Sequence, residues 1–173
     1  MFVRNKKIIF KNEINMYPLE LLKANRKKFF ALVDDLSAEE INKIPAGFNN
    51  NIAWNFGHAV VAAYSLAYVR SGVNASMQIP FAEKYKPGTK PEQFVSKDEI
   101  ESLKKASDDF FIQIEKDLSE NKFHHVEPFA PPFAPKTLGV EAKTIEEYLI
   151  YIYGHDVLHC ATASAQKRIV TEK

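Results

Sequence analysis

The chain has little or nothing of several features that define major classes of protein. It contains a single cysteine, Cys160, in 173 residues, so it cannot form an internal disulfide, and a free thiol fits a reducing compartment. Nowhere do about 18 apolar residues run together, the length that a membrane-spanning helix needs. The apolar run near the start, residues 8–10, is too short for the core of a signal peptide. We therefore expect a cytoplasmic protein without a membrane partner.

The chain also lacks an excess of charge of either sign. Its 23 basic and 22 acidic residues leave a formal net charge of +1, which provides no general attraction to nucleic acid or to an anionic membrane. Apolar residues make up 46% of the chain, enough to build a sizeable core. The length fits one domain. We expect residues 1–16 to form an N-terminal arm and residues 17–173 to form a single domain.

Four long stretches carry the apolar spacing of amphipathic helices. The first begins near Pro18, a residue suited to the first turn of a helix, and continues to Leu36. Directly afterwards, Ser37 and Glu40 form a capping-box pattern that predicts a short helix ending before Pro45. We interpret the basic run of the first helix as a solvated face. Its members are Lys23, Arg26, Lys27 and Lys28.

Capping residues predict where the other three long helices begin. The second follows the asparagines at 49–51 and ends near Gly72, because glycine is favoured just beyond a helix. The third begins after Ser96 and ends near Asn121. The fourth begins after Thr144, with a glutamate three residues later, and meets no further proline.

Two long connections separate these helices, at residues 73–95 and 122–143. Each contains several prolines, so neither can be helical throughout. No segment alternates apolar and polar residues as a half-buried strand does. The pattern predicts an all-α fold, a four-helix bundle in which the long connections join helices 2 and 3 and helices 3 and 4.

Three of the five histidines fall on helix stripes that should face the core. His155 and His159 are four residues apart on the last helix, so their Cβ atoms lie about 6 Å apart on one face. His58 occupies an inward position on the second long helix. If these helices face each other, the three imidazoles converge into an open site suited to zinc, nickel or iron. The alternative is that the histidines are packed and hydrogen-bonded without a metal.

The residue that follows His155 has more than one interpretation. The pattern H-D-x-x-H resembles the H-E-x-x-H of zinc proteases, in which the carboxylate is a general base. Asp156 has a shorter side chain, and no third histidine follows, so a protease is a poor match. Asp156 is then a general base, a carboxylate that supports a metal ligand, or a solvated side chain. We expect Cys160 to be packed and expect His124 and His125 at the surface.

Two motifs together resemble those of the DinB/YfiT-like superfamily of small four-helix bundles. They are Asn51-x-x-Trp54-x-x-Gly57-His58 and His155-x-x-x-His159. The similarity extends over nearly the whole chain from Pro18, including the loop at residues 85–89, and leaves residues 1–16 outside. It implies that the three histidines bind a divalent metal ion, commonly zinc or nickel. It also implies a homodimer, since many members form dimers.

The resemblance implies a chemistry as well. Characterised members include enzymes that use bacillithiol, mycothiol or glutathione. The first hypothesis is therefore a metal-dependent enzyme that transfers a low-molecular-weight thiol to an electrophilic small molecule, with Lys86 or Lys90 holding the carboxylates of the thiol. The second is a metal-dependent hydrolase that uses metal-bound water, with Asp156 as base. The third is a non-catalytic dimeric bundle.

Overall fold

The computed structural model describes residues 16–128 and 141–172. Its helices, in chain order, are α1 (Tyr17–Asp34), α2 (Ala38–Asn42), α3 (Ile52–Tyr64), the π-helical segment η1 (Ser65–Arg70), α4 (Ala82–Tyr85), α5 (Lys97–Ser119) and α7 (Ile145–Thr171). The described residues contain no β-strand, so the prediction of an all-α fold is confirmed. None of these helices is long and apolar enough to cross a membrane. The expected arm lies, apart from Met16, outside the described residues.

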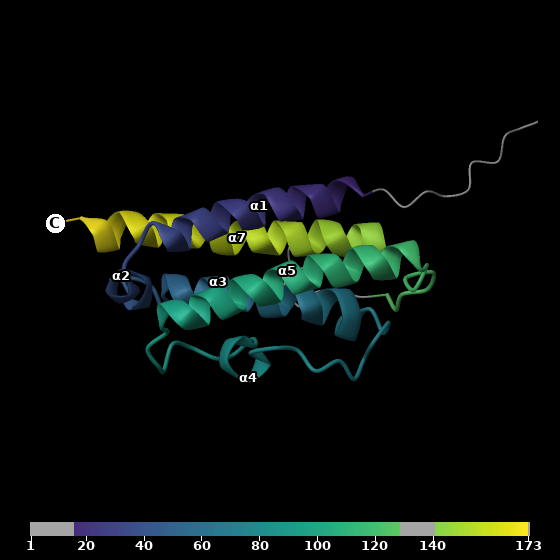
Figure 1. Ribbon diagram of the computed structural model, residues 1–173, viewed down its shortest axis with the longest axis horizontal. Helices are drawn as coiled ribbons and strands as arrows, with labels where there is room; N and C mark the ends of the chain where they lie inside the picture. The colour runs from purple at the N-terminus through teal and green to yellow at the C-terminus, as the bar shows by residue number, and fades with distance from the viewer. Residues whose placement is uncertain (1–15, 129–140, 173) are drawn as a thin grey trace, which may run out of the picture.

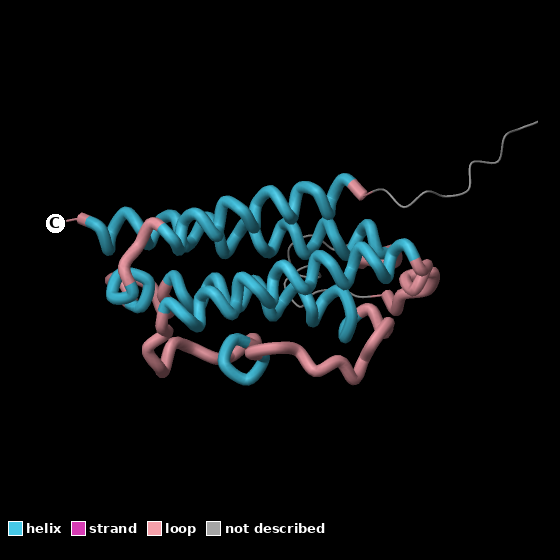
Figure 2. The backbone as a smooth tube through the Cα atoms, viewed as in Figure 1, coloured by secondary structure: helices cyan, strands magenta, loops and turns pink. Residues whose placement is uncertain are grey.

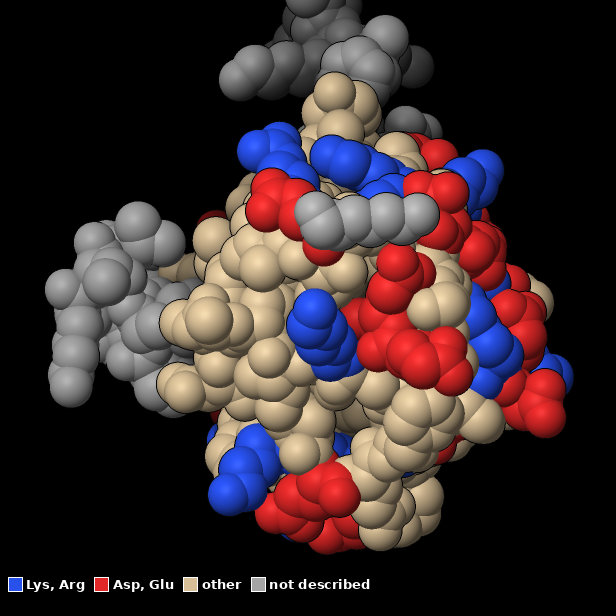
Figure 3. Space-filling view, turned by 90° about the vertical axis from the view of Figure 1, so that its left-hand side faces the viewer, with Lys and Arg blue, Asp and Glu red and all other residues tan. Residues whose placement is uncertain are grey.

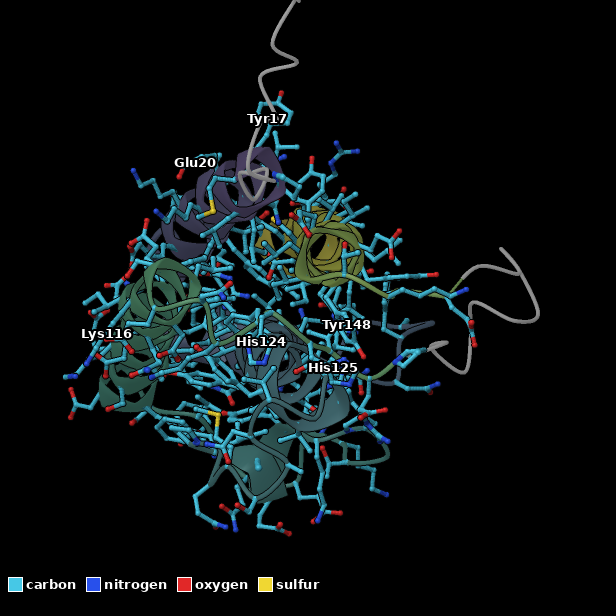
Figure 4. All side chains as sticks on the ribbon, turned by 90° about the vertical axis from the view of Figure 1, so that its right-hand side faces the viewer. Tyr17, Glu20, Lys116, His124, His125 and Tyr148 are labelled. Atoms are coloured by element: carbon cyan, nitrogen blue, oxygen red, sulfur yellow. The ribbon has the colours of Figure 1, made fainter. Side chains whose placement is uncertain are left out.

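Four long helical segments lie side by side: α1, α3 with η1, α5 and α7 (Figures 1 and 2). Seen end-on, they form the corners of a bundle, and the short α4 lies outside it next to α3 (Figure 4). The main partners of α7 are α1 and α3. This packing brings the last helix of the chain against the second long one, which is the arrangement that the histidine hypothesis requires.

The helices begin where the capping residues are. Asn51 accepts a hydrogen bond from the backbone amide of Trp54 at 2.8 Å, and Ser96 accepts one from the amide of Glu99 at 3.1 Å. Ser37 and Thr144 each form a complete capping box with the glutamate three residues later. Such caps satisfy amides that have no partner within the helix, and each contributes about 1 kcal/mol.

The central element of the bundle is α3, every residue of which is buried. Its sequence is apolar on all sides, with alanines that let neighbouring helices approach closely, and it packs against α5, α7 and α4. A helix that is apolar all round belongs in a core. His58 is therefore held on the most enclosed element of the protein.

One expectation about α1 is wrong. The sequence places Arg26 on a solvated basic face, but its side chain is only 2% exposed, whereas Lys27 and Lys28 are exposed. Arg26 Nη2 donates to Asp156 Oδ1 on α7 at 2.5 Å and to the carbonyl of Ala59 on α3 at 3.1 Å. A buried charge needs such a partner. The partner is 130 residues away in the chain, so the local pattern of α1 does not reveal it.

The connection between η1 and α5 packs against α3 through Tyr85, the last residue of α4. The Tyr85 side chain is 1% exposed, and its hydroxyl donates to Glu99 Oε1 at 2.6 Å. Its ring lies over Gly57, where an added Cβ would come within 2.5 Å of Tyr85 Cδ1. Gly57 therefore admits the close approach of this connection to the helix that carries His58.

Candidate metal centre

Three histidines from two helices converge in the bundle. His58 comes from α3, and His155 and His159 lie one turn apart on α7. A ligand atom from each lies within 4.8 Å of the other two. The ring centroids are 4.5 Å apart for His155 and His159, 4.7 Å for His58 and His159, and 5.1 Å for His58 and His155. His58 is buried and the other two are half-buried, so the cluster reaches solvent along α7.

Hydrogen bonds from the protein orient two of the three rings. His58 Nδ1 lies 2.7 Å from the carbonyl oxygen of Tyr85, so this nitrogen donates. His159 Nδ1 lies 2.8 Å from Asn55 Oδ1. Asn55 Nδ2 donates to Gln166 Oε1 at 3.0 Å, which fixes the amide so that its oxygen accepts from His159. Nδ1 is thus the protonated nitrogen in both rings, and Nε2 is the atom left to bind a ligand.

Burial keeps the three rings neutral. It lowers the pKa of His58 below its ordinary value, although the hydrogen bond to Tyr85 opposes this effect. Burial lowers the pKa of His155 to about 4, with further contributions from His58 and Arg26. Burial also lowers the pKa of His159 to about 3, and the neighbouring groups His155, His58 and Arg26 lower it further. Neutral imidazole is the form that binds metals.

This donor set fits a divalent metal ion. Within the described part of the chain, no fourth histidine, cysteine or carboxylate joins this group. Three neutral imidazoles with an open position for water or substrate are typical of catalytic rather than structural zinc sites. Nitrogen ligands also suit nickel. The hydrogen bonds from Nδ1 to a backbone carbonyl and to an amide are the supporting contacts that metal-binding histidines usually have.

Trp54 forms one wall of the cluster. Its ring stacks on that of His58 with a centroid distance of 4.6 Å and an interplanar angle of 7°. Its Nε1 donates to Thr89 Oγ1 at 3.0 Å, which links this wall to the loop after α4. A cavity of about 420 Å³ is lined by Trp54, Thr89 and Lys90 together with other residues of that loop, but by none of the three histidines. Lys86 does not line this cavity and is paired with Glu83, which does.

Asp156 is buried beside the cluster, with an exposed fraction of 1%. Its Oδ1 accepts from Arg26, and its Oδ2 accepts from Asn25 Nδ2 at 2.7 Å. The interpretation of Asp156 as a solvated side chain is therefore wrong. Both carboxylate oxygens bind α1, and these bonds fix the turn of α7 that carries His155. The ion pair thus holds α1 and α7 together next to the cluster.

The remaining candidates lie away from the cluster. Cys160 is 2% exposed, as expected of a packed thiol, and burial raises its pKa, which disfavours a reactive thiolate. His124 and His125 are exposed, as expected, at the end of the bundle that faces the viewer in Figure 4. Asn55 and its partner Gln166 support the cluster but were not predicted from the sequence. Gln166 lies on the inward stripe of the last helix, and a polar side chain in such a position signals a buried hydrogen bond.

A family model described as the DinB superfamily matches residues 21–163. This range contains both halves of the histidine cluster and the motif around Trp54 and Gly57. No curated protein and no solved structure matches the chain.

Proposed function

The chain belongs to the DinB superfamily, and we propose that it is a metal-dependent enzyme that transfers a low-molecular-weight thiol to an electrophilic small molecule. The metal, zinc or nickel, would be held by His58, His155 and His159. The observation that carries this proposal is the convergence of the three histidines, two of which have Nδ1 occupied by a protein acceptor. When bound, such an ion supplies Lewis acidity, which favours the thiolate form of a thiol.

The residues around the cluster have separate tasks in this proposal. Tyr85 and Asn55 keep Nε2 of His58 and His159 available by accepting a hydrogen bond from Nδ1. Trp54 excludes water from one side of His58. The half-buried side along α7 is left for the thiol and its electrophile to approach. Three protein ligands leave a position for the thiol, which a four-ligand structural site lacks.

Lys90 is the cation best suited to hold a carboxylate of the thiol. It is exposed and lines the cavity next to Trp54. Within the described residues it forms no ion pair, whereas Lys84 is paired with Glu99 and Lys86 with Glu83. Of the two lysines expected from the sequence, the structure therefore favours Lys90 for this role.

The first experiment measures metal content. Protein purified without chelator should contain about one zinc or nickel ion per chain by elemental analysis. His58→Ala should lose most of it. His125→Ala is the matched control, because its side chain is 73% exposed, and it should keep the metal. A wild-type protein with almost no metal, or equal metal in both variants, would contradict the proposal.

The second experiment tests the reaction. Glutathione, bacillithiol and mycothiol are each supplied with a chromogenic electrophile such as an aryl chloride, and formation of the thioether is followed. Product should depend on the thiol and on the metal. Lys90→Ala should raise KM for the thiol several-fold with little change in kcat, because Lys90 binds a part of the thiol that does not react. Turnover of an ester substrate without any thiol would favour the hydrolase instead.

A further inference from the structure

A line of hydrogen bonds runs from the start of α3 to the histidine cluster. His159 Nδ1 lies 2.8 Å from Asn55 Oδ1. Asn55 Nδ2 donates to Gln166 Oε1 at 3.0 Å and to the backbone carbonyl of Asn51 at 2.9 Å. Gln166 Nε2 donates to the backbone carbonyl of Asn50 at 2.5 Å. The line therefore joins a candidate metal ligand on α7 to two backbone carbonyls at the beginning of another helix.

The backbone end of this line determines the direction of every bond in it. The carbonyls of Asn50 and Asn51 accept hydrogen bonds and cannot donate them, so the nitrogen of each side-chain amide must point toward a carbonyl. The amide oxygen of Gln166 then faces Asn55, and the amide oxygen of Asn55 faces His159. An acceptor at this place requires a proton on Nδ1 of the ring. The two carbonyls thus determine, through two amides, that His159 offers Nε2 to a ligand.

The cap of α3 holds this backbone end in place. Asn51 Oδ1 accepts from the amide of Trp54 at 2.8 Å, and Asn51 Nδ2 donates to the carbonyl of Asn42 at 2.9 Å. The carbonyl of Asn51 also accepts a helical bond from the amide of Asn55 at 3.1 Å. The line of hydrogen bonds therefore begins in the first turn of a buried helix, where the backbone is well ordered.

Both amides are enclosed by the protein. Asn55 is 2% exposed and Gln166 is 0% exposed. Figure 3 views the bundle from the end at which α7 finishes, and it shows acidic and basic side chains at that surface. Because the amides are buried, water and these surface charges do not compete for their hydrogen bonds. A buried amide that turned over would lose its partners, which costs free energy.

The same bonds fix how far α7 is displaced along α3. His159 and Gln166 are seven residues apart, so they lie on one side of α7 about two turns from each other. Asn55 bonds to both of them at once. A shift of α7 by one turn, about 5.4 Å, would break both bonds and would move His159 away from His58. Buried polar side chains define the register of packed helices in this way in other assemblies.

We propose that Gln166 is a positioning residue of the metal centre, which acts through Asn55 to hold His159 in the tautomer protonated at Nδ1 and in register with His58. This role rests on the proposed metal site. Gln166 lies beyond residues 21–163, the range that the family model matches, so that match assigns it no role. Without a fixed acceptor at Nδ1, a neutral imidazole can carry its proton on either nitrogen. A ring protonated at Nε2 cannot bind a metal ion through that atom.

Nuclear magnetic resonance of the metal-free protein tests the tautomer directly. Proton–nitrogen correlation spectra of the imidazoles distinguish a protonated ring nitrogen from an unprotonated one. His159 of the wild type should be protonated at Nδ1, whereas Gln166→Leu should contain both tautomers. Gln113→Leu is the matched control, because it also removes a side-chain hydrogen bond, the one of 2.7 Å to Asp117, but lies on α5. It should give the wild-type spectrum for His159.

Zinc affinity, measured by competition with a chromogenic chelator, separates positioning from a merely structural role. Gln166→Leu should weaken zinc binding by about 10-fold. Asn55→Asp has two acceptor oxygens and no donor, so this side chain accepts from His159 whichever way it turns. Adding Gln166→Leu to Asn55→Asp should therefore cause no further loss of zinc affinity. If Gln166 only stabilised the fold, the loss would be the same with and without Asn55→Asp.

Three results would overturn the proposal. They are a wild-type His159 protonated at Nε2, an unchanged tautomer in Gln166→Leu, and an equal loss of zinc affinity in both backgrounds. The first result needs no variant, so it decides the question even if Gln166→Leu fails to fold. The tautomer is measured without metal, so a wild type that binds no zinc contradicts the proposed function alone. A wild type that binds zinc, together with an unchanged tautomer in Gln166→Leu, contradicts only the role of Gln166.

Discussion

The buried ion pair between Arg26 and Asp156 provides the most direct test of how a paired buried charge contributes to the stability of the fold. Both side chains are almost completely buried, with exposed fractions of 2% and 1%. Arg26 also donates to Ser107 and to the carbonyl of Ala59, so it links α1 to α5 and α3 as well as to α7. Arg26→Met keeps most of the side-chain volume and removes the charge. Among the residues that the structure describes, Asn25 of α1 is then the one side chain that still donates a hydrogen bond to the buried Asp156 carboxylate.

The expected loss of unfolding free energy is large because a charge is left without its partner. Removing one member of a buried pair typically costs about 3–5 kcal/mol. Replacing both members, as in Arg26→Met with Asp156→Leu, should cost much less, since the desolvation of both charges is avoided. The exposed pair Lys105–Asp109 is the control, with side-chain exposures of 75% and 51%. Lys105→Met should cost about 0.5 kcal/mol or less.

Urea unfolding followed by circular dichroism measures all four proteins. The order of stability should be wild type, then Lys105→Met, then the double variant, with Arg26→Met the least stable. A loss for Arg26→Met no larger than that of the exposed control would refute the reasoning. So would a double variant that is less stable than Arg26→Met alone, because the penalty would then not come from an unpaired buried charge.

Two glycines and one carboxylate provide further tests. Gly57→Ala should lower the unfolding free energy by about 1–3 kcal/mol and weaken metal binding, because its Cβ would lie 2.5 Å from the ring of Tyr85, whose carbonyl holds His58. Gly154→Ala should instead stabilise the protein by about 1 kcal/mol in the same urea assay, because an added Cβ meets no atom within 4 Å. Burial raises the pKa of Asp117, but hydrogen bonds to its carboxylate outweigh that effect and lower the pKa overall. Its stabilisation is therefore complete above the unfolded-state pKa of about 3.9 and is lost as the pH falls through the lower folded-state pKa. Asp117→Asn should accordingly make unfolding less dependent on pH in acid.

Local patterns in the sequence predicted much of the fold. The caps at Asn51, Ser96 and Thr144 act within three residues of a helix start, so their effect can be read from a short stretch of chain. The helical period also placed His155 and His159 on one side of α7 and His58 on an inward position of α3. Convergence of these rings needed only that the two helices pack against each other.

The contacts that the sequence did not predict join residues far apart in the chain. Arg26 looks like part of a basic face until Asp156 is placed against it, because burial of a charge depends on a partner from another helix. The bond from His58 to the carbonyl of Tyr85 involves a backbone atom of a connection, and no residue type marks such an acceptor. The short helix α4 was also missed, since its one turn is stabilised by the packing of Tyr85 rather than by its own period.

The stacking of Trp54 on His58 gives the protein an intrinsic optical reporter. Trp54 is the only tryptophan in the chain, and its indole is 7% exposed with its ring 4.6 Å from that of His58. The tryptophan fluorescence of the protein therefore comes from a single side chain, which forms one wall of the histidine cluster. Any change in the charge or ligation of His58 acts directly on the emitting ring. Titrations with metal ions can thus be followed at low protein concentration without attaching a dye or altering a residue.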